Sequence, residues 1–144
     1  MFYCLILLTL VAHVSGAIGG LIGTMQSAGA NGTFVCNGRP EANVLVKLYD
    51  QDRLLSTDDL MGETKTDRNG YFRVVGKIRE ISTIDPKLNV YHDCNDGWKP
   101  CQRKFSIKLP DSYVTNGDIP RRIYDVGRME LAGKMPGEER DCLH

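Results

Sequence analysis

Cysteine is the residue type in this sequence with the most evident chemistry. Five cysteines occur: Cys4 near the start of the chain, and Cys36, Cys94, Cys101 and Cys142 further on. Cys4 falls in an apolar N-terminal segment that we expect to be removed, so four remain. An even set in an exported chain predicts disulfide bonds instead of free thiols or zinc ligands.

The spacing of the four cysteines predicts how they pair. Cys94 and Cys101 flank a turn of six residues, 95–100. If the two flanking strands pair, these cysteines lie opposite each other at distances that a disulfide can bridge. We therefore expect Cys94–Cys101, which leaves Cys36–Cys142 to attach the C-terminal tail to the first strand. The spacing is not Cys-x-x-Cys, so both bonds are expected to be structural.

A histidine stands two residues before one of these cysteines. His92 and Cys94 together resemble half of a zinc site, but a structural zinc ion needs four ligands. We expect His92 to lie on a sheet, hydrogen-bonded to an aspartate or to the backbone, and we predict no metal or other cofactor.

An acidic segment follows the second predicted strand and raises the question of calcium binding. It contains Asp50, Asp52, Asp58 and Asp59. A calcium loop of the EF-hand type requires glycine at its sixth position, where this segment has Leu55. We therefore expect a solvated loop.

A tryptophan at the tip of a turn beside cations is a candidate binding surface. Trp98 stands in the turn between Cys94 and Cys101, and Lys99, Arg103 and Lys104 follow it. Such a combination suits an anionic, partly apolar partner. The alternative is that the indole folds back onto the sheet. A second basic pair, Arg121 and Arg122, either extends this area or solvates a loop.

The N-terminal segment has the pattern of a secretory signal peptide. An apolar run begins at Leu5, and the small residues Ser15, Gly16 and Ala17 follow it. The run is too short to span a bilayer. We expect cleavage after Ala17, with Gly16 as the alternative, and hence a secreted product. The 18 basic and 18 acidic residues balance, so there is no overall charge that favours nucleic acid.

The elements that position these residues follow a period of two, which is typical of strands. Some segments alternate apolar and polar residues, and others are runs of residues that favour strands. Turn signals separate them every eight to twelve residues, which indicates a β-sandwich. The Asn-Gly pair at Asn69 predicts a hairpin, and residues 77–84 are compatible with one short helix. We expect strands at 33–36, 43–49, 62–66, 71–75, 88–94, 101–109 and 123–131.

One N-glycosylation sequon is present, Asn31-Gly32-Thr33. It matters only if the chain is exported. A glycan on Asn31 would have to sit on an exposed edge of the first strand.

Several segments together resemble the nematode transthyretin-like family of secreted proteins. The resemblance covers the chain after the signal and is most specific from Tyr91 to Lys104. The matching segments are 26–27, 36–40, 44–50, 63–67, 69–70, 84–86, 91–97, 99–104 and 136–142. The resemblance implies an all-β, immunoglobulin-like sandwich of seven or eight strands over residues 25–133. A signal peptide at 1–17 and a flexible lead-in at 18–24 would precede it, and a disulfide-tethered polar tail at 134–144 would follow.

The resemblance also implies a non-enzymatic extracellular binding or bridging role. The expected partner is an extracellular or cell-surface protein, or an anionic membrane surface, and an oligomer is compatible with the family. One alternative is a carrier of a small apolar ligand, which would require a tetramer with a central channel. Another is a hydrolase of the hydroxyisourate hydrolase type. That reaction needs a general base beside an activated water, and only His92 and His144 remain after signal removal.

Overall fold

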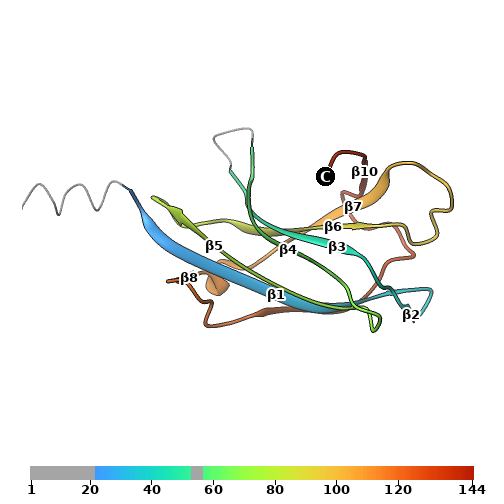
Figure 1. Cartoon of the computed structure of the whole chain (residues 1–144), viewed down its shortest axis with the longest axis horizontal. Helices are drawn as coiled ribbons and strands as arrows, with labels where there is room; N and C mark the ends of the chain where they lie inside the picture. Colours follow the sequence, from blue (N-terminus) through green and yellow to red (C-terminus); the bar gives the residue numbers. More distant parts are fainter. Residues whose placement is uncertain (1–21, 53–56) are drawn as a thin grey trace, which may run out of the picture.

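The chain folds as a sandwich of two β-sheets (Figure 1), as a computed structural model shows for residues 22–52 and 57–144. The predicted signal peptide, Cys4 and most of the predicted lead-in lie outside these residues. The elements are β1 Thr24–Cys36, β2 Arg39–Pro40, β3 Leu45–Asp50, β4 Asp59–Lys65, β5 Tyr71–Glu80, β6 Pro86–His92, β7 Gln102–Lys108, the 3-10 helix η1 Asp111–Tyr113, β8 Thr115–Asn116, β9 Tyr124–Glu130 and β10 Glu139–Asp141.

The two sheets differ in construction. In sheet A the long strand β1 is central: it pairs antiparallel with β2, β5 and β8 and parallel with β9. Sheet B is wholly antiparallel, in the order β10-β7-β6-β3-β4. The all-β sandwich predicted from the sequence is therefore confirmed, and seven of its strands have six or more residues.

Side chains that alternate inward from both sheets form the core. Phe34 of β1 stacks on Phe72 of β5 with ring centroids 5.1 Å apart, and meets the edge of Phe105 of β7 at 6.4 Å. This aromatic cluster joins the two sheets, and each ring is nearly or fully buried. Aliphatic residues complete the layer: Val46, Leu48, Val74, Leu88 and Val90.

The first strand is longer than the sequence predicted. A glycine-rich segment loses much entropy on ordering, so we expected firm structure only from Thr33. The structure instead begins β1 at Thr24. The glycines allow neighbouring elements to come close: a Cβ at Gly32 would lie 2.3 Å from a methyl carbon of Val126, and one at Gly29 would lie 2.7 Å from Ile123. Three partner strands, β5, β8 and β9, supply the pairing that orders the segment.

The turn at Asn69 does not form a hairpin. Gly70 donates its N–H to the carbonyl of Asp67 and has φ +77°, as a tight turn requires. However, β4 before the turn pairs with β3, and β5 after it pairs with β1. The turn therefore carries the chain from one sheet to the other, which a local signal cannot distinguish from a hairpin.

The sequence of residues 77–84 was compatible with a short helix, but the structure of these residues contains none. These residues continue β5 as far as Glu80, because Lys77 to Glu80 pair with Thr24 to Ser27 of β1. The only helical segment described is the single turn η1. No helix among the described residues has the length and apolar character needed to cross a membrane.

Candidate binding surface

The loop between β6 and β7, residues 93–101, carries the exposed tryptophan. We call it the Trp98 loop. Trp98 is 102% exposed relative to a free side chain, so its indole projects into solvent and does not fold back on the sheet. Asn95 and Gly97 have positive φ values of 54° and 56°, which let the chain turn twice within the loop.

The disulfide pairing that we predicted is wrong. The structure joins Cys36 to Cys94 and Cys101 to Cys142. Cys94 lies after the end of β6, next to the end of β1 in the other sheet, and the Cα atoms of Cys36 and Cys94 are 5.7 Å apart. Cysteine spacing reflects only the two strands that the loop connects, whereas the partner of Cys94 lies in the neighbouring sheet. All four cysteines do form disulfides, and the two bonds hold opposite ends of the Trp98 loop.

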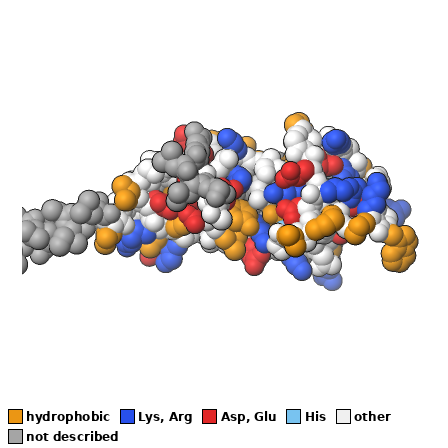
Figure 2. Space-filling view, turned by 90° about the horizontal axis from the view of Figure 1, so that it is seen from above, with side chains coloured by type: hydrophobic (Ala, Val, Ile, Leu, Met, Phe, Trp, Pro, Cys, Tyr) orange, Lys and Arg blue, Asp and Glu red, His pale blue; other side chains and the backbone are white. Residues whose placement is uncertain are grey.

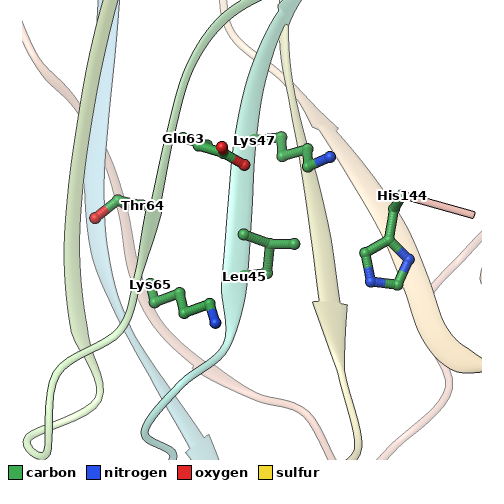
Figure 3. A pocket seen from close by; sticks show the side chains of 6 residues that line it. All are labelled: Leu45, Lys47, Glu63, Thr64, Lys65 and His144. Atoms are coloured by element: carbon green, nitrogen blue, oxygen red, sulfur yellow. The ribbon is translucent and has the colours of Figure 1, made fainter.

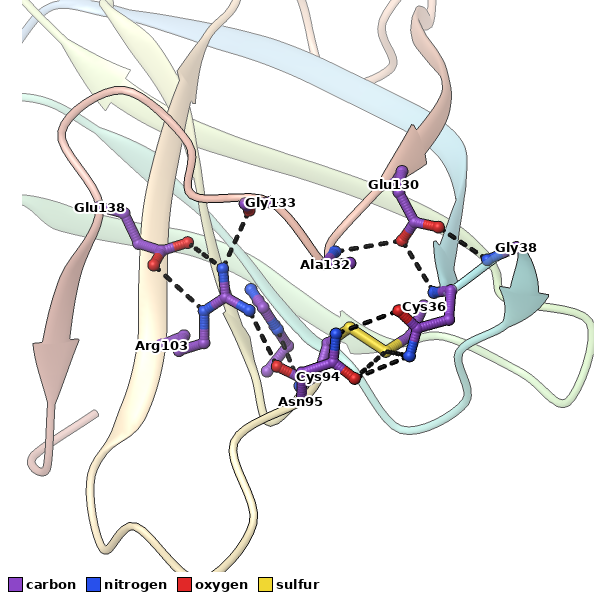
Figure 4. The surroundings of a disulfide bond; sticks show 11 residues. Cys36, Gly38, Cys94, Asn95, Arg103, Glu130, Ala132, Gly133 and Glu138 are labelled. Carbon is purple, nitrogen blue, oxygen red and sulfur yellow. Dashed lines mark hydrogen bonds and ion pairs between the residues drawn. A yellow bond between two sulfur atoms is a disulfide. The ribbon is translucent and has the colours of Figure 1, made fainter.

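Side-chain pairs reinforce the first of these anchors (Figure 4). Asn37 and Asn95 exchange two amide hydrogen bonds of 2.7 and 3.1 Å. The Glu130 carboxylate accepts N–H groups from Ala132, Asn37 and Gly38. These hydrogen bonds lower the pKa of Glu130 below its usual value, and the bond from Ala132 has the largest effect. The turn after β1 and the Trp98 loop are thus tied together.

The C-terminal segment 138–142, which we call the C-terminal clasp, provides the second anchor. Arg140 makes a two-pronged ion pair with Asp96 of the Trp98 loop, with N–O distances of 2.6 and 2.8 Å. It also donates to the carbonyl of Cys101 at 2.9 Å. The hydrogen bonds from Arg140 lower the pKa of Asp96, despite the burial of this carboxylate. β10 pairs with β7, so the tail that we expected to be only tethered is a strand of sheet B.

Arg103 of β7 binds this clasp and is not part of the exposed surface where the sequence placed it. It is 8% exposed. Its guanidinium contacts the Glu138 carboxylate at 2.8 and 3.1 Å and donates to the carbonyls of Cys94 and Gly133. Burial opposes ionisation of Glu138, but the bonds and charge of Arg103 prevail and hold its pKa below the usual value. The run of four charged residues at 138–141 was the available sequence signal for this clasp.

The other predicted basic residues lie in three places. Lys99 is exposed beside Trp98 at the tip of the loop. Lys104 lies on the outer face of β7 and is paired with Glu139 at 3.3 Å and Asp141 at 3.5 Å, so its charge is balanced. Arg121 and Arg122 follow β8, which pairs with the start of β1, whereas the Trp98 loop is tied to its end. They therefore do not extend this surface.

The Trp98 loop lies at one end of the sandwich, beside the turn that contains β2 (Figure 1). Lys and Arg side chains gather at one end of the face seen in Figure 2. Leu143 adds a second exposed apolar side chain, 95% exposed, directly after Cys142 of the disulfide to Cys101. The candidate binding surface is therefore Trp98 and Lys99 on the anchored loop.

His92 is a buried residue of β6 and takes no part in this surface. Its Nδ1 accepts the N–H of Cys94 at 3.1 Å, and its Nε2 is buried without a hydrogen-bond partner. Burial and the charge of Arg103 lower its pKa from 6.5 to about 4. The expectation that it bonds to the backbone is confirmed. Cys94 is in a disulfide, so the two residues do not form a zinc half-site.

The acidic segment differs from the solvated loop that we expected. Asp50 is the last residue of β3, is 8% exposed, and accepts the N–H of Asp85 at 2.8 Å. Carboxylate oxygens of Asp50, Asp59 and Glu80 lie within 4.8 Å of one another. Burial has the largest effect in raising the pKa of Glu80, and the neighbouring carboxylates raise it further. Leu55 lies outside the described residues.

The sequon asparagine is not at a strand edge. Asn31 lies in the middle of β1, with Arg73 of β5 on one side and Asp125 of β9 on the other. It is half-buried, and its Oδ1 is enclosed without a hydrogen-bond partner. Glycosylation of Asn31 stays a prediction, and a glycan would rise from the face of sheet A.

Comparisons with known proteins agree with this fold. The model of the transthyretin-like family matches residues 31–110. The chain belongs to the transthyretin-like family. Its relatives from Caenorhabditis elegans include transthyretin-like protein 5, which is 58% identical over 97% of this chain and 98% of its own length. Transthyretin-like protein 33 is 45% identical over 89% of this chain and 90% of its own, and transthyretin-like protein 2 is 43% identical over 99% and 98%.

The relatives extend over nearly the full length of this family member, so the resemblance inferred from its motifs is confirmed. Among solved structures, a 9R-lipoxygenase from Cyanothece PCC8801 aligns with 74% of this chain and 16% of its own, at 20% identity and a TM-score of 0.43. That likeness is too distant to bear on function.

Proposed function

We propose that this transthyretin-like protein is a secreted extracellular binding protein, not an enzyme, that recognises a partner on cell surfaces through the Trp98 loop. One observation carries the proposal: a fully exposed tryptophan stands on a loop that two disulfides and an Arg–Asp pair hold in place. Tryptophan is among the residues enriched at the energetic centres of interfaces, together with tyrosine and arginine.

The anchoring of the loop supports binding because it lowers the entropy cost of association. A loop that is already ordered gives up less freedom when a partner docks, so more of the contact energy appears as affinity. Lys99 beside the indole favours a partner with an apolar pocket and acidic groups at its rim. Secretion is supported by the signal-like N-terminal pattern and by the two disulfides, which persist in oxidising compartments.

The experiment is affinity capture from cell-surface extracts with the mature chain immobilised. Trp98→Ala is the test variant. Ile119→Ala is the matched control, because Ile119 is 80% exposed and follows β8, near the start of β1. We expect proteins that the wild type and the Ile119 variant retain and the Trp98 variant loses. Equal capture by all three would overturn the proposal.

Vesicles distinguish a protein partner from a membrane. Emission from Trp98 reports directly on its surroundings, because it is the single tryptophan of the chain. A blue shift with anionic but not with neutral vesicles would assign the surface to anionic lipid and refute a protein partner. Unchanged emission with both kinds of vesicle supports the protein partner.

A further inference from the structure

A groove on the outer face of sheet B has the composition of a small-ligand site. The strand registers place Leu45 of β3, Tyr91 of β6 and Lys104 of β7 in one row across this face. An outer sheet face is ordinarily solvated. Tyr91 is nevertheless only 2% exposed, so something covers it.

An aromatic ring covers Tyr91, and two lysines also approach it. The ring of His144 stacks on that of Tyr91, with centroids 4.2 Å apart and an angle of 23° between the planes. The ammonium groups of Lys47 and Lys104 approach the same ring, at 5.8 and 5.9 Å from its centroid. This face thus already holds one flat ring against Tyr91.

Beside this stack the face is hollowed. A groove of about 490 Å³ is lined by Leu45, Lys47, Glu63, Thr64, Lys65 and His144. Figure 3 shows Leu45 between Lys65 and His144, with Lys47 reaching from β3 toward the side of His144. The volume is within the range of small-molecule sites, about 300–1,000 Å³.

The charge of the groove favours an anion. Lys104 is balanced by the clasp carboxylates of Glu139 and Asp141. Lys47 and Lys65 form no ion pair with any described residue, although Glu63 lies across the strand pair from Lys47. Among the side chains that line the groove, two lysines without an ion pair thus stand against one carboxylate.

We propose that this groove binds a small organic carboxylate with a flat apolar body. Lys47 and Lys65 contact the carboxylate, and the body packs on Leu45 and against the ring of His144. Charge-assisted hydrogen bonds and an apolar floor together orient such a ligand. The groove lies on one face of a single chain, so this site requires no tetramer and is separate from the Trp98 loop.

The test is calorimetric titration of the mature chain with 1-naphthoate and with its uncharged counterpart 1-naphthamide. We expect saturable binding of naphthoate and no measurable binding of naphthamide. Lys47→Ala and Lys65→Ala should each weaken naphthoate binding about tenfold, the effect of losing one charge-assisted hydrogen bond. Lys108→Ala is the control, because Lys108 is exposed on the same outer face but does not line the groove.

Three outcomes overturn the site: no saturable naphthoate binding, equal binding of naphthamide, or the same loss in the Lys108 variant as in the Lys47 variant. Trp98→Ala separates this site from the proposed function. Naphthoate binding that persists in the Trp98 variant supports a distinct groove. Binding that is lost there assigns the ligand to the Trp98 loop and refutes the groove.

Discussion

Arg103 and Glu138, 35 residues apart in sequence, form a two-pronged ion pair that is almost completely buried. The pair connects β7 with the segment that leads into β10, and Arg103 also binds the carbonyl of Cys94 at 2.8 Å. One guanidinium thus ties the C-terminal clasp to the base of the Trp98 loop. Loss of either partner leaves a buried charge without compensation.

Glu138→Gln should lower the free energy of unfolding by about 3 kcal/mol, the usual cost of breaking a buried ion pair. Replacing both partners, as Arg103→Met with Glu138→Leu, should cost much less, since no charge is then stranded. Urea denaturation of the wild type, the Glu138→Gln variant, the double variant and its single variants Arg103→Met and Glu138→Leu measures this difference. A double variant as unstable as the sum of its two single variants would contradict it.

The two disulfides should differ in how readily they are reduced. The chain-entropy model gives each roughly 4 kcal/mol, since their sequence separations of 58 and 41 residues are similar. Access differs: Cys142 is exposed, whereas Cys94 is 2% exposed. We expect a mild dithiol reductant, followed by alkylation and peptide mapping, to label Cys101 and Cys142 first. Earlier labelling of Cys36 and Cys94 would be inconsistent with this burial.

Much of the fold was predictable because strand alternation and turn chemistry are local. The limits of Leu45–Asp50 and Gln102–Lys108 followed within a residue or two from such patterns. Assignment of strands to sheets was not predictable, because the turn at Asn69 has the same local chemistry whether it closes a hairpin or crosses between sheets.

The candidate site was predictable in part for the same reason. The position of Trp98 in a turn was read from the sequence, but whether its indole is exposed or folds back on the sheet was left open. Burial of Arg103 was not predictable, because it depends on Glu138, which reaches it only when β10 pairs with β7. The disulfide partners likewise depend on which sheet ends meet, and cysteine spacing carries no information on that.

His92 should make stability depend on pH. Its pKa is about 4 in the folded chain and 6.5 in a free side chain, so the unfolded chain binds the proton more readily. The contribution of neutral His92 to the free energy of unfolding is complete above pH 6.5. As the pH falls toward 4, this free energy decreases by about 3 kcal/mol in all.

His92→Asn is the test variant, because asparagine also accepts an N–H two residues ahead and does not titrate. Thermal unfolding between pH 7.5 and 4.5 should show a smaller decline for this variant than for the wild type. Parallel curves would exclude His92 as the source of the decline.

Gly76 of β5 should tolerate no side chain. A Cβ there would lie 2.5 Å from the carbonyl oxygen of Met61 in β4, where the two sheets meet. Gly76→Ala should destabilise by about 1–3 kcal/mol, the usual range for overpacking. Gly133→Ala, where nothing lies within 4 Å, should change stability by less than about 0.5 kcal/mol. Equal midpoints in urea for both variants would rule out the close approach.

Trp98 is solvated yet held still, which leaves it ready for a partner. Fluorescence of the single tryptophan measures both properties in the free protein. We predict emission at the wavelength of fully solvated indole, full access to acrylamide, and an anisotropy decay dominated by tumbling of the whole molecule. Emission shifted to the blue and shielded from acrylamide, or a large fast component in the decay, would contradict the account.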